Sequence, residues 1–182
     1  HVILNSIRST NMKFRKDYGQ MYIICDSRKN WRRESFPEYK ACRAKGRKES
    51  KFDFELIFKC LDTVKNDLND SFPYHVMAKD RLEADDIIGI LAQNTAEPTI
   101  IISNDKDFPQ LHNEHVCQYR PHNHKVIRVS DPKAVLIEHI IRGDKDDGVP
   151  NILSPDDVFV TEKRQTPITQ KRYDDLYKMV ED

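Results

Sequence analysis

Carboxylate side chains gather in four short clusters along this chain of 182 residues. The eight residues are Asp26, Glu83, Asp85, Asp86, Asp105, Asp107, Asp144 and Asp147. Carboxylates that crowd together repel one another, so they either take up protons or bind cations. Oxygen ligands of this kind are preferred by Mg²⁺ and Mn²⁺, and no single cluster supplies a complete set. We therefore predict that the clusters together hold two such ions.

Two ions of this kind indicate phosphodiester hydrolysis. In that chemistry the ions lie about 3.5–4 Å apart, and one activates water while the other stabilises the leaving oxygen. Asp105 and Asp107 would point to the same side if the backbone stays extended. On a helix, Glu83 and Asp86 share one face, and Asp85 points about 100° away, so some of these carboxylates would act indirectly.

A basic segment contrasts with the acidic clusters. The net charge of the whole chain is zero, but residues 28–51 contain ten Lys or Arg and three Asp or Glu. The segment also carries the aromatic residues Trp31, Phe36 and Tyr39. Such a charge separation favours a polyanion held by the basic segment and cations held by the acidic clusters. A solvated, disordered surface segment is the alternative reading of the same residues.

The elements that must position these side chains alternate between strands and helices. Apolar runs predict strands at 21–25, 73–77, 99–103, 116–119 and 125–129. Helical spacing of apolar residues, or capping residues, predicts helices at 1–14, 52–68, 81–94, 131–143 and after 169. This alternation is typical of an α/β three-layer sandwich with a mostly parallel central sheet. Ligands bind such sheets at the carboxyl ends of strands, where Asp26, Asp105 and Asp107 stand.

Several other classes are excluded by what the sequence lacks. The phosphate-binding motif G-x-x-x-x-G-K-[ST] is absent, which argues against a P-loop kinase or ATPase. The serine nucleophile motif G-x-S-x-G is absent as well. The segment DKDDG fails as a calcium loop, because Gly148 is the fifth residue from Asp144 and the twelfth is Pro155. The four cysteines show no C-x-x-C spacing, which fits a reducing cytoplasm, and no apolar run could span a membrane.

Four stretches together carry a resemblance to a known family. They are ICDSRKNWRRESFPEYKACR, EADDIIGIL, IIISNDKDFPQLH and IRGDKDDGVPNI. EADD, then S-x-D-x-D-F, then G-D-x-x-D at these distances is a specific combination. The chain resembles the 5′ nuclease (flap endonuclease) family from Tyr22 to about Ile152, and within it the T-even phage branch of RNase H type. The resemblance implies a PIN-like, resolvase-like fold.

The resemblance also implies roles for the acidic residues. Asp26, Asp85 and Asp105 would be ligands of the first metal ion. Asp107, Asp144 and Asp147 would serve the second, directly or through water. Glu83 and Asp86 would support the cluster.

The basic segment resembles the family's helical arch, through the Tyr-Lys-x-x-Arg pattern that begins at Tyr39. Lys40, with Arg32 or Arg33, would then touch the scissile phosphate and stabilise developing charge. The side chains expected to bind nucleic acid are Lys40, Arg43, Lys45, Arg47 and Lys48.

The same comparison predicts the domain organisation. Residues 1–142 would form the nuclease domain, with the arch at about 28–51. Residues 143–182 would begin a helix–loop–helix module that grips duplex DNA through its backbone. The family opens with a strand that carries a further metal-binding Asp, upstream of residue 1, so we expect the chain to be a fragment at both ends.

The expected function is a 5′-to-3′ exonuclease and flap endonuclease that uses Mg²⁺ or Mn²⁺ and removes RNA primers during replication. Its substrates would be DNA and RNA/DNA duplexes with 5′ flaps or ends, and replication proteins such as a single-strand-binding protein and a sliding clamp would be partners. We expect a monomer in the cytoplasm, which is the host's if a phage encodes it. The alternatives are an inactive nucleic-acid-binding module of the same fold and a PIN-like single-strand ribonuclease.

Overall fold

The chain folds into two units. In the computed structural model, the described part of the chain comprises residues 1–181, apart from the side chains at positions 44, 45, 48, 49 and 181. Unit 1 contains residues 1–30 and 55–129, and unit 2 contains residues 31–54 and 130–182. Each unit is described by itself below.

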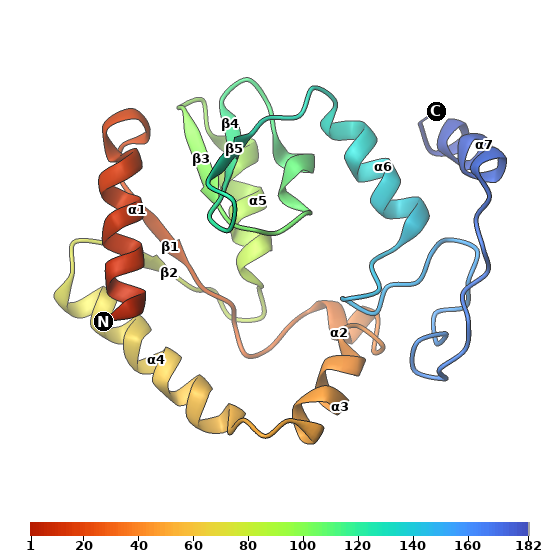
Figure 1. Cartoon of the computed structure of the whole chain (residues 1–182), viewed down its shortest axis with the longest axis horizontal. Coiled ribbons are helices and arrows are strands. Elements are labelled where there is room, and N and C mark those ends of the chain that lie inside the picture. Colours follow the sequence, from red (N-terminus) through yellow and green to blue (C-terminus); the bar gives the residue numbers. More distant parts are fainter. Residues whose placement is uncertain (182) are drawn as a thin grey trace. The chain divides into compact units, whose positions relative to one another are not determined.

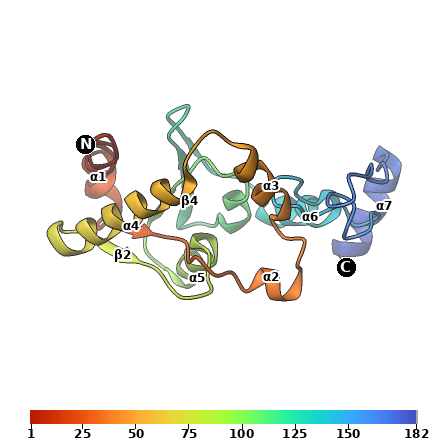
Figure 2. The ribbon, with the colours of Figure 1, turned by 90° about the horizontal axis from the view of Figure 1, so that it is seen from below.

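Unit 1 alternates strands and helices. Its elements are α1 (Val2–Tyr18), β1 (Tyr22–Ile24), α4 (Phe54–Ser71), β2 (His75–Met77), α5 (Ala84–Asn94), β3 (Thr99–Ile102), the 3₁₀ helix η1 (Phe108–Leu111), β4 (Val116–Arg120) and β5 (Lys125–Ile127). Every strand and helix predicted from the sequence in this unit is present. Figures 1 and 2 show the β1–β2 ribbon with α1 and α4 on one side of the unit, and the other strands with α5 on the other.

The strands of unit 1 form two sheets. β1 and β2 pair in parallel, with Tyr22 opposite His75, and β4 pairs in parallel with β3 but antiparallel with β5. The described strands thus form two sheets where the sequence predicted one central sheet, and two of their three pairings are parallel, as a mostly parallel sheet requires. The mixed direction has a simple cause, because the four residues 121–124 between β4 and β5 can join only antiparallel strands.

A small apolar core holds α5 and η1 against the mixed sheet. Ala92, Ile101, Phe108 and Val116 are buried together, and Ile88 and Leu111 pack on them. Full burial of a side chain such as Ile, Phe or Val contributes about 1.5–3 kcal/mol to the stability of the fold. The core therefore fixes the segment 103–107, which runs from the end of β3 to the start of η1.

The described residues of unit 2 form four helices. They are α2 (Arg32–Ser35), α3 (Ala41–Glu49), α6 (Pro132–Arg142) and α7 (Gln170–Glu181). α6 begins and ends as predicted, because Asp131 accepts the backbone N–H of Ala134 and Gly143 turns the chain with φ 67°. Figure 2 shows α7 next to α6, where the Arg142 guanidinium lies 4.6 Å from the Tyr173 ring centre. The helix–loop–helix function of this region stays a prediction.

None of the helices described for residues 1–181 combines the length and the apolar character needed to cross a membrane.

Candidate active site

The end of strand β1 is tied to the start of helix α5. Asp26 follows the strand, and its Oδ1 accepts the backbone N–H of Ala84, the first residue of α5, at 2.7 Å. The next backbone N–H, that of Ser27, donates to the carbonyl of Leu82. A carboxylate at this end of a helix also interacts favourably with the helix dipole. Asp26 therefore lies beside the acidic start of α5, as the two clusters would need in a shared cation site.

Two of the three carboxylates at the start of α5 cap the helix. Glu83 and Asp86 form a capping box, in which Asp86 Oδ2 accepts the backbone N–H of Glu83 at 2.9 Å. Glu83 is buried, with 9% of its surface exposed, whereas Asp85 is exposed. The capping explains why acidic residues stand here, and their role at a metal stays a prediction.

Asp105 and Asp107 lie on a turn that follows β3. The strand ends at Ile102, the Ser103 hydroxyl accepts the backbone N–H of Asp105 at 3.1 Å, and Asp105 Oδ1 accepts that of Asp107 at 2.9 Å. Side-chain acceptors of this kind bend the backbone into a turn. The extended backbone that would point Asp105 and Asp107 to the same side is therefore not present.

Gln118 holds this turn in place, and sequence reasoning missed it. Its side chain is fully buried in β4, and Nε2 donates to the carbonyls of Ser103 at 2.9 Å and of Asp105 at 2.6 Å. Gln110 adds a third bond, from Nε2 to the carbonyl of Asp107 at 2.9 Å. A signal existed, because a lone amide inside the apolar strand VCQY must find hydrogen-bond partners when it is buried.

The donor atoms in unit 1 suit a hard divalent cation. Asp26 and Asp105 are exposed, each uses Oδ1 for a backbone N–H, and Oδ2 of each accepts no hydrogen bond from the described residues. All these donors are oxygens, as Mg²⁺ and Mn²⁺ prefer. Among the described side chains of unit 1, no three candidate ligands have their ligand atoms within 4.8 Å of one another. A bound cation would offset the repulsion between these carboxylates.

A cleft of about 420 Å³ opens beside Asp26 in unit 1. Its lining includes Asp26, Arg28, Asp62, Lys65 and Lys79. Arg28 forms an ion pair with Asp62, and its hydrogen bond lowers the pKa of the Asp62 carboxyl. The lining thus mixes acidic and basic groups directly next to the end of β1.

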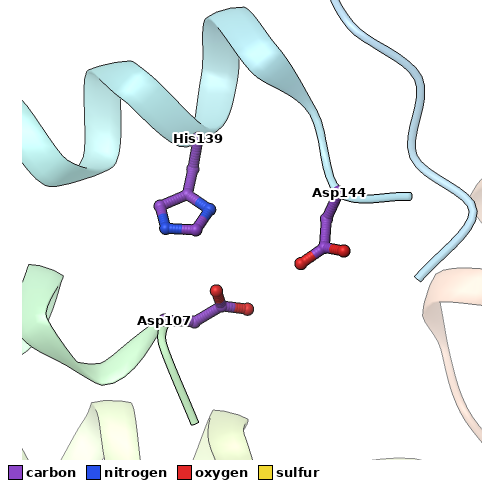
Figure 3. Close-up of side chains that lie close together, drawn as sticks. All are labelled: Asp107, His139 and Asp144. Carbon is purple, nitrogen blue, oxygen red and sulfur yellow. The ribbon is translucent and has the colours of Figure 1, made fainter. Parts of the chain in front are cut away.

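Asp144 organises the loop that follows α6 in unit 2. Its Oδ1 accepts the backbone N–H of Asp146 at 2.8 Å, and its backbone pairs with Val149 in both directions. Figure 3 draws Asp144 after the end of α6 and His139 in the last turn of that helix; it also labels Asp107, at the N-terminal end of η1 in unit 1. Asp144 as a metal ligand stays a prediction.

Asp147, in the same loop, binds the basic segment. Its Oδ2 accepts the hydroxyl of Tyr39 at 2.9 Å, and its Oδ1 lies 2.5 Å from Nη2 of Arg43. Nζ of Lys40 lies 3.5 Å from Oδ2, and the backbone N–H of Lys40 donates to the Asp147 carbonyl at 2.7 Å. The sequence assigned Asp147 to a cation and Lys40 and Arg43 to a phosphate; the structure pairs them with one another.

The other predicted cationic residues have varied surroundings. The Arg32 guanidinium lies 4.9 Å from the Trp31 ring centre, and Arg33 is exposed. Nε of Arg47 donates to the carbonyl of Arg43 at 3.3 Å within α3. The side chains of Lys45 and Lys48 lie outside the described part of the chain. Contact of these residues with nucleic acid stays a prediction.

Comparison with known proteins places the chain in a family. Residues 1–139 match the family described as 5′-3′ exonuclease, N-terminal resolvase-like domain. Ribonuclease H of Enterobacteria phage T4 is 36% identical in an alignment of 179 positions that covers 92% of this chain and 58% of that protein. DNA polymerase I of Chloroflexus aurantiacus is 33% identical over 107 residues, or 57% of this chain and 10% of that protein. The chain thus spans less than two thirds of the length of these relatives.

Solved structures share the fold. The T5 5′-exonuclease with bound divalent zinc ions matches with a TM-score of 0.70 and 17% identity, over 98% of this chain and 75% of that one. The bacteriophage T5 flap endonuclease, in a complex with DNA and metal ions, matches with a TM-score of 0.71 and 18% identity, over 97% of this chain and 76% of that one. The resemblance predicted from the sequence is confirmed: the chain belongs to the 5′-3′ exonuclease family, through its N-terminal resolvase-like domain.

Proposed function

We propose that the protein is a 5′ nuclease that hydrolyses phosphodiester bonds at the 5′ ends and flaps of DNA and RNA/DNA duplexes. The observation that carries this proposal is the placement of Asp26, Asp85 and Asp105 in unit 1, at the ends of β1 and β3 and the start of α5. The family and the nuclease relatives support it. Removal of RNA primers during replication is the role that this chemistry would serve.

The proposal includes divalent cations, Mg²⁺ or Mn²⁺. Asp26, Asp85 and Asp105 would hold the first of two ions, and the roles of Asp107, Asp144 and Asp147 at the second remain as predicted from the sequence. Such ions, when bound, activate water and stabilise the leaving oxygen of a phosphodiester. The T5 5′-exonuclease, which has the same fold, has been solved with divalent zinc ions, and the T5 flap endonuclease with DNA and metal ions.

The protein's own residues would orient the substrate. Lys40 would contact the scissile phosphate with Arg32 or Arg33, and these cations would stabilise charge that develops during the reaction. Gln118 and Gln110 would hold the carbonyls of the Asp105–Asp107 turn, so that its carboxylates stay in place while substrate binds. Contacts to the phosphate backbone would make binding sensitive to salt and insensitive to sequence.

The test is cleavage of a 5′-labelled flap duplex by the natural protein, measured with Mg²⁺ and with EDTA. We expect cutting only with Mg²⁺, and its loss in the double variant Asp105→Asn, Asp107→Asn with duplex binding retained. The matched control is Asp67→Asn with Asp70→Asn, two exposed carboxylates of α4, which should cut like the wild type. Binding without cutting in all of these proteins would favour the inactive binding module.

Substrate preference distinguishes the proposed 5′ nuclease from a single-strand ribonuclease of the same fold. Equal cutting of unstructured RNA and of the flap duplex would support that alternative. Preference for the flap, with cleavage placed at the junction, would contradict it. Partner proteins of replication, and a location in the cytoplasm of a phage host, are also part of the proposal, and the similarity to a phage T4 protein supports a phage origin.

A further inference from the structure

Three donors of different chemistry converge on one carboxylate in unit 2. The Tyr39 hydroxyl donates to Oδ2 of Asp147 at 2.9 Å, Nη2 of Arg43 lies 2.5 Å from Oδ1, and Nζ of Lys40 lies 3.5 Å from Oδ2. Tyr39 is 6% exposed, and the side chains of Lys40 and Asp147 are 15% and 22% exposed. The carboxylate therefore fills a built anion site and does not merely pair with a surface cation.

The backbone holds both sides of this contact. The Lys40 N–H donates to the Asp147 carbonyl at 2.7 Å, and Nε of Arg43 donates to the Asp146 carbonyl at 3.1 Å. A Cβ at Gly148 would lie 3.0 Å from the carbonyl oxygen of Glu38, so glycine is needed for the backbone of Gly148 to approach that of Glu38 so closely. The donors are thus preorganised around an anion before any substrate arrives.

We infer that Tyr39, Lys40 and Arg43 form a phosphate site that Asp147 occupies in the free protein, so that nucleic acid binds by displacing Asp147. This rests on the proposed function, which makes nucleic acid the substrate, and adds an internal competitor to it. A phosphodiester, like a carboxylate, carries one negative charge shared by two outward oxygens. Hydroxyl, ammonium and guanidinium groups are the donors that proteins use for phosphate.

Exchange of the two anions is feasible because the site is near solvent. The Arg43 side chain is 49% exposed, so a phosphate can reach this donor from solvent. After displacement, Asp147 regains both oxygens as acceptors, which suits the cation role predicted for it. A cation on Asp147 and a phosphate on Lys40 and Arg43 would then both favour the arrangement in which Asp147 is separated from Lys40 and Arg43.

The first measurement is the affinity for a labelled 5′-flap duplex in EDTA, which removes cations from the comparison. Asp147→Asn keeps the shape of the side chain and removes its charge, so we expect binding about tenfold tighter than wild type. The matched control is Asp146→Asn, the neighbouring residue with the same change in net charge. It should alter the affinity by no more than about twofold, as a general electrostatic effect.

A double-variant cycle locates the effect. If Asp147 competes for Arg43, Asp147→Asn should tighten binding when Arg43 is present and lose most of that gain in the Arg43→Gln background. Trp31 is the only tryptophan and lies in the same segment as Tyr39. The emission spectrum of free Asp147→Asn should therefore shift toward that of the wild type bound to duplex.

Circular dichroism melting establishes that each variant is folded, and Asp147→Ser replaces Asp147→Asn if the latter is not. Suppose that the wild type binds and cuts the flap duplex, but Asp147→Asn binds it no more tightly than Asp146→Asn does. This result would contradict competition by Asp147 and leave the proposed function unaffected. Equal tightening with and without Arg43 would also contradict that competition. If the wild type neither binds nor cuts the flap duplex, the proposed function and this inference fail together.

Discussion

The carboxylate of Asp26 accepts the backbone N–H of Ala84 at 2.7 Å, so the residue that ends β1 also caps α5. The two residues are 58 positions apart in the sequence, and the bond joins two of the acidic clusters. Asp26 has a structural role that is independent of any cation. Its substitution must therefore be designed to separate the two roles.

Asp26→Asn should separate capping from charge. The amide oxygen can still accept the Ala84 N–H, so the free energy of unfolding should change by less than about 0.5 kcal/mol. Cleavage of a flap duplex with Mg²⁺ should fall by about a hundredfold or more, because the charge is lost. Asp26→Ala should lose the cap as well and cost about 1 kcal/mol of stability, measured by urea unfolding. A fully active Asp26→Asn protein would contradict the proposed ligand role.

Gln118→Met should weaken the acidic turn after β3. The change removes both donors to the carbonyls of Ser103 and Asp105, and we expect a loss of roughly 1–3 kcal/mol in stability. Calorimetric titration with Mn²⁺ should show an affinity about 10- to 100-fold lower, as for other residues that support metal ligands.

Gln93→Met is the control, because it makes the same change at an exposed position of α5 and should alter neither quantity. An unchanged Mn²⁺ affinity in a destabilised Gln118→Met protein would limit Gln118 to a structural role.

His112 should make stability depend on pH. The side chain is buried, and its Nδ1 accepts the backbone N–H of Val129 at 3.2 Å. Burial lowers the pKa of His112, and the charges of Arg128 and Arg120 lower it further. The unfolded chain therefore takes up the proton first as the pH drops below about 6.5, and the free energy of unfolding falls.

Urea unfolding at pH 7.5, 6.5 and 5.5 measures this slope. His112→Asn, whose Oδ1 can replace Nδ1 as an acceptor, should flatten the slope over that range. His115→Asn, at a partly exposed position, should leave it in place. Equal slopes in the wild type and His112→Asn would show that His112 does not contribute.

Replacing glycine by alanine should change the free energy of unfolding in opposite directions at two positions. Gly143 has φ 67°, and a Cβ there would lie 2.4 Å from the carbonyl of Pro150, so Gly143→Ala should cost roughly 2–4 kcal/mol. Gly89 lies inside α5, where a Cβ would meet its nearest atom, in Leu111, at 4.0 Å. Gly89→Ala should therefore stabilise the protein by about 0.5–1 kcal/mol, measured by thermal melting. Equal effects of the two changes would contradict this account of the loop after α6.

Local patterns predicted most of the elements. The apolar run TIII gave β3, and Asp131, Pro132 and Gly143 gave both ends of α6, because strands and caps are encoded by neighbouring residues. The capping box of Glu83 and Asp86 at the start of α5 is likewise a local pattern, because the two residues are three positions apart.

Pairing between distant residues was beyond the sequence. The bonds of Asp147 to Tyr39 and Arg43 join positions more than 100 residues apart, and no spacing rule connects them. The Asp105–Asp107 turn is also held by Gln118, which lies on the neighbouring strand β4.

The capping role of the acidic residues at α5 bears on the order of events as the protein matures. Asp26, Glu83 and Asp86 each accept a backbone N–H at the positive end of one helix, so part of their repulsion is offset by the polypeptide itself. This region can thus fold without a bound cation. Binding of the proposed cations would then be a late step that follows folding.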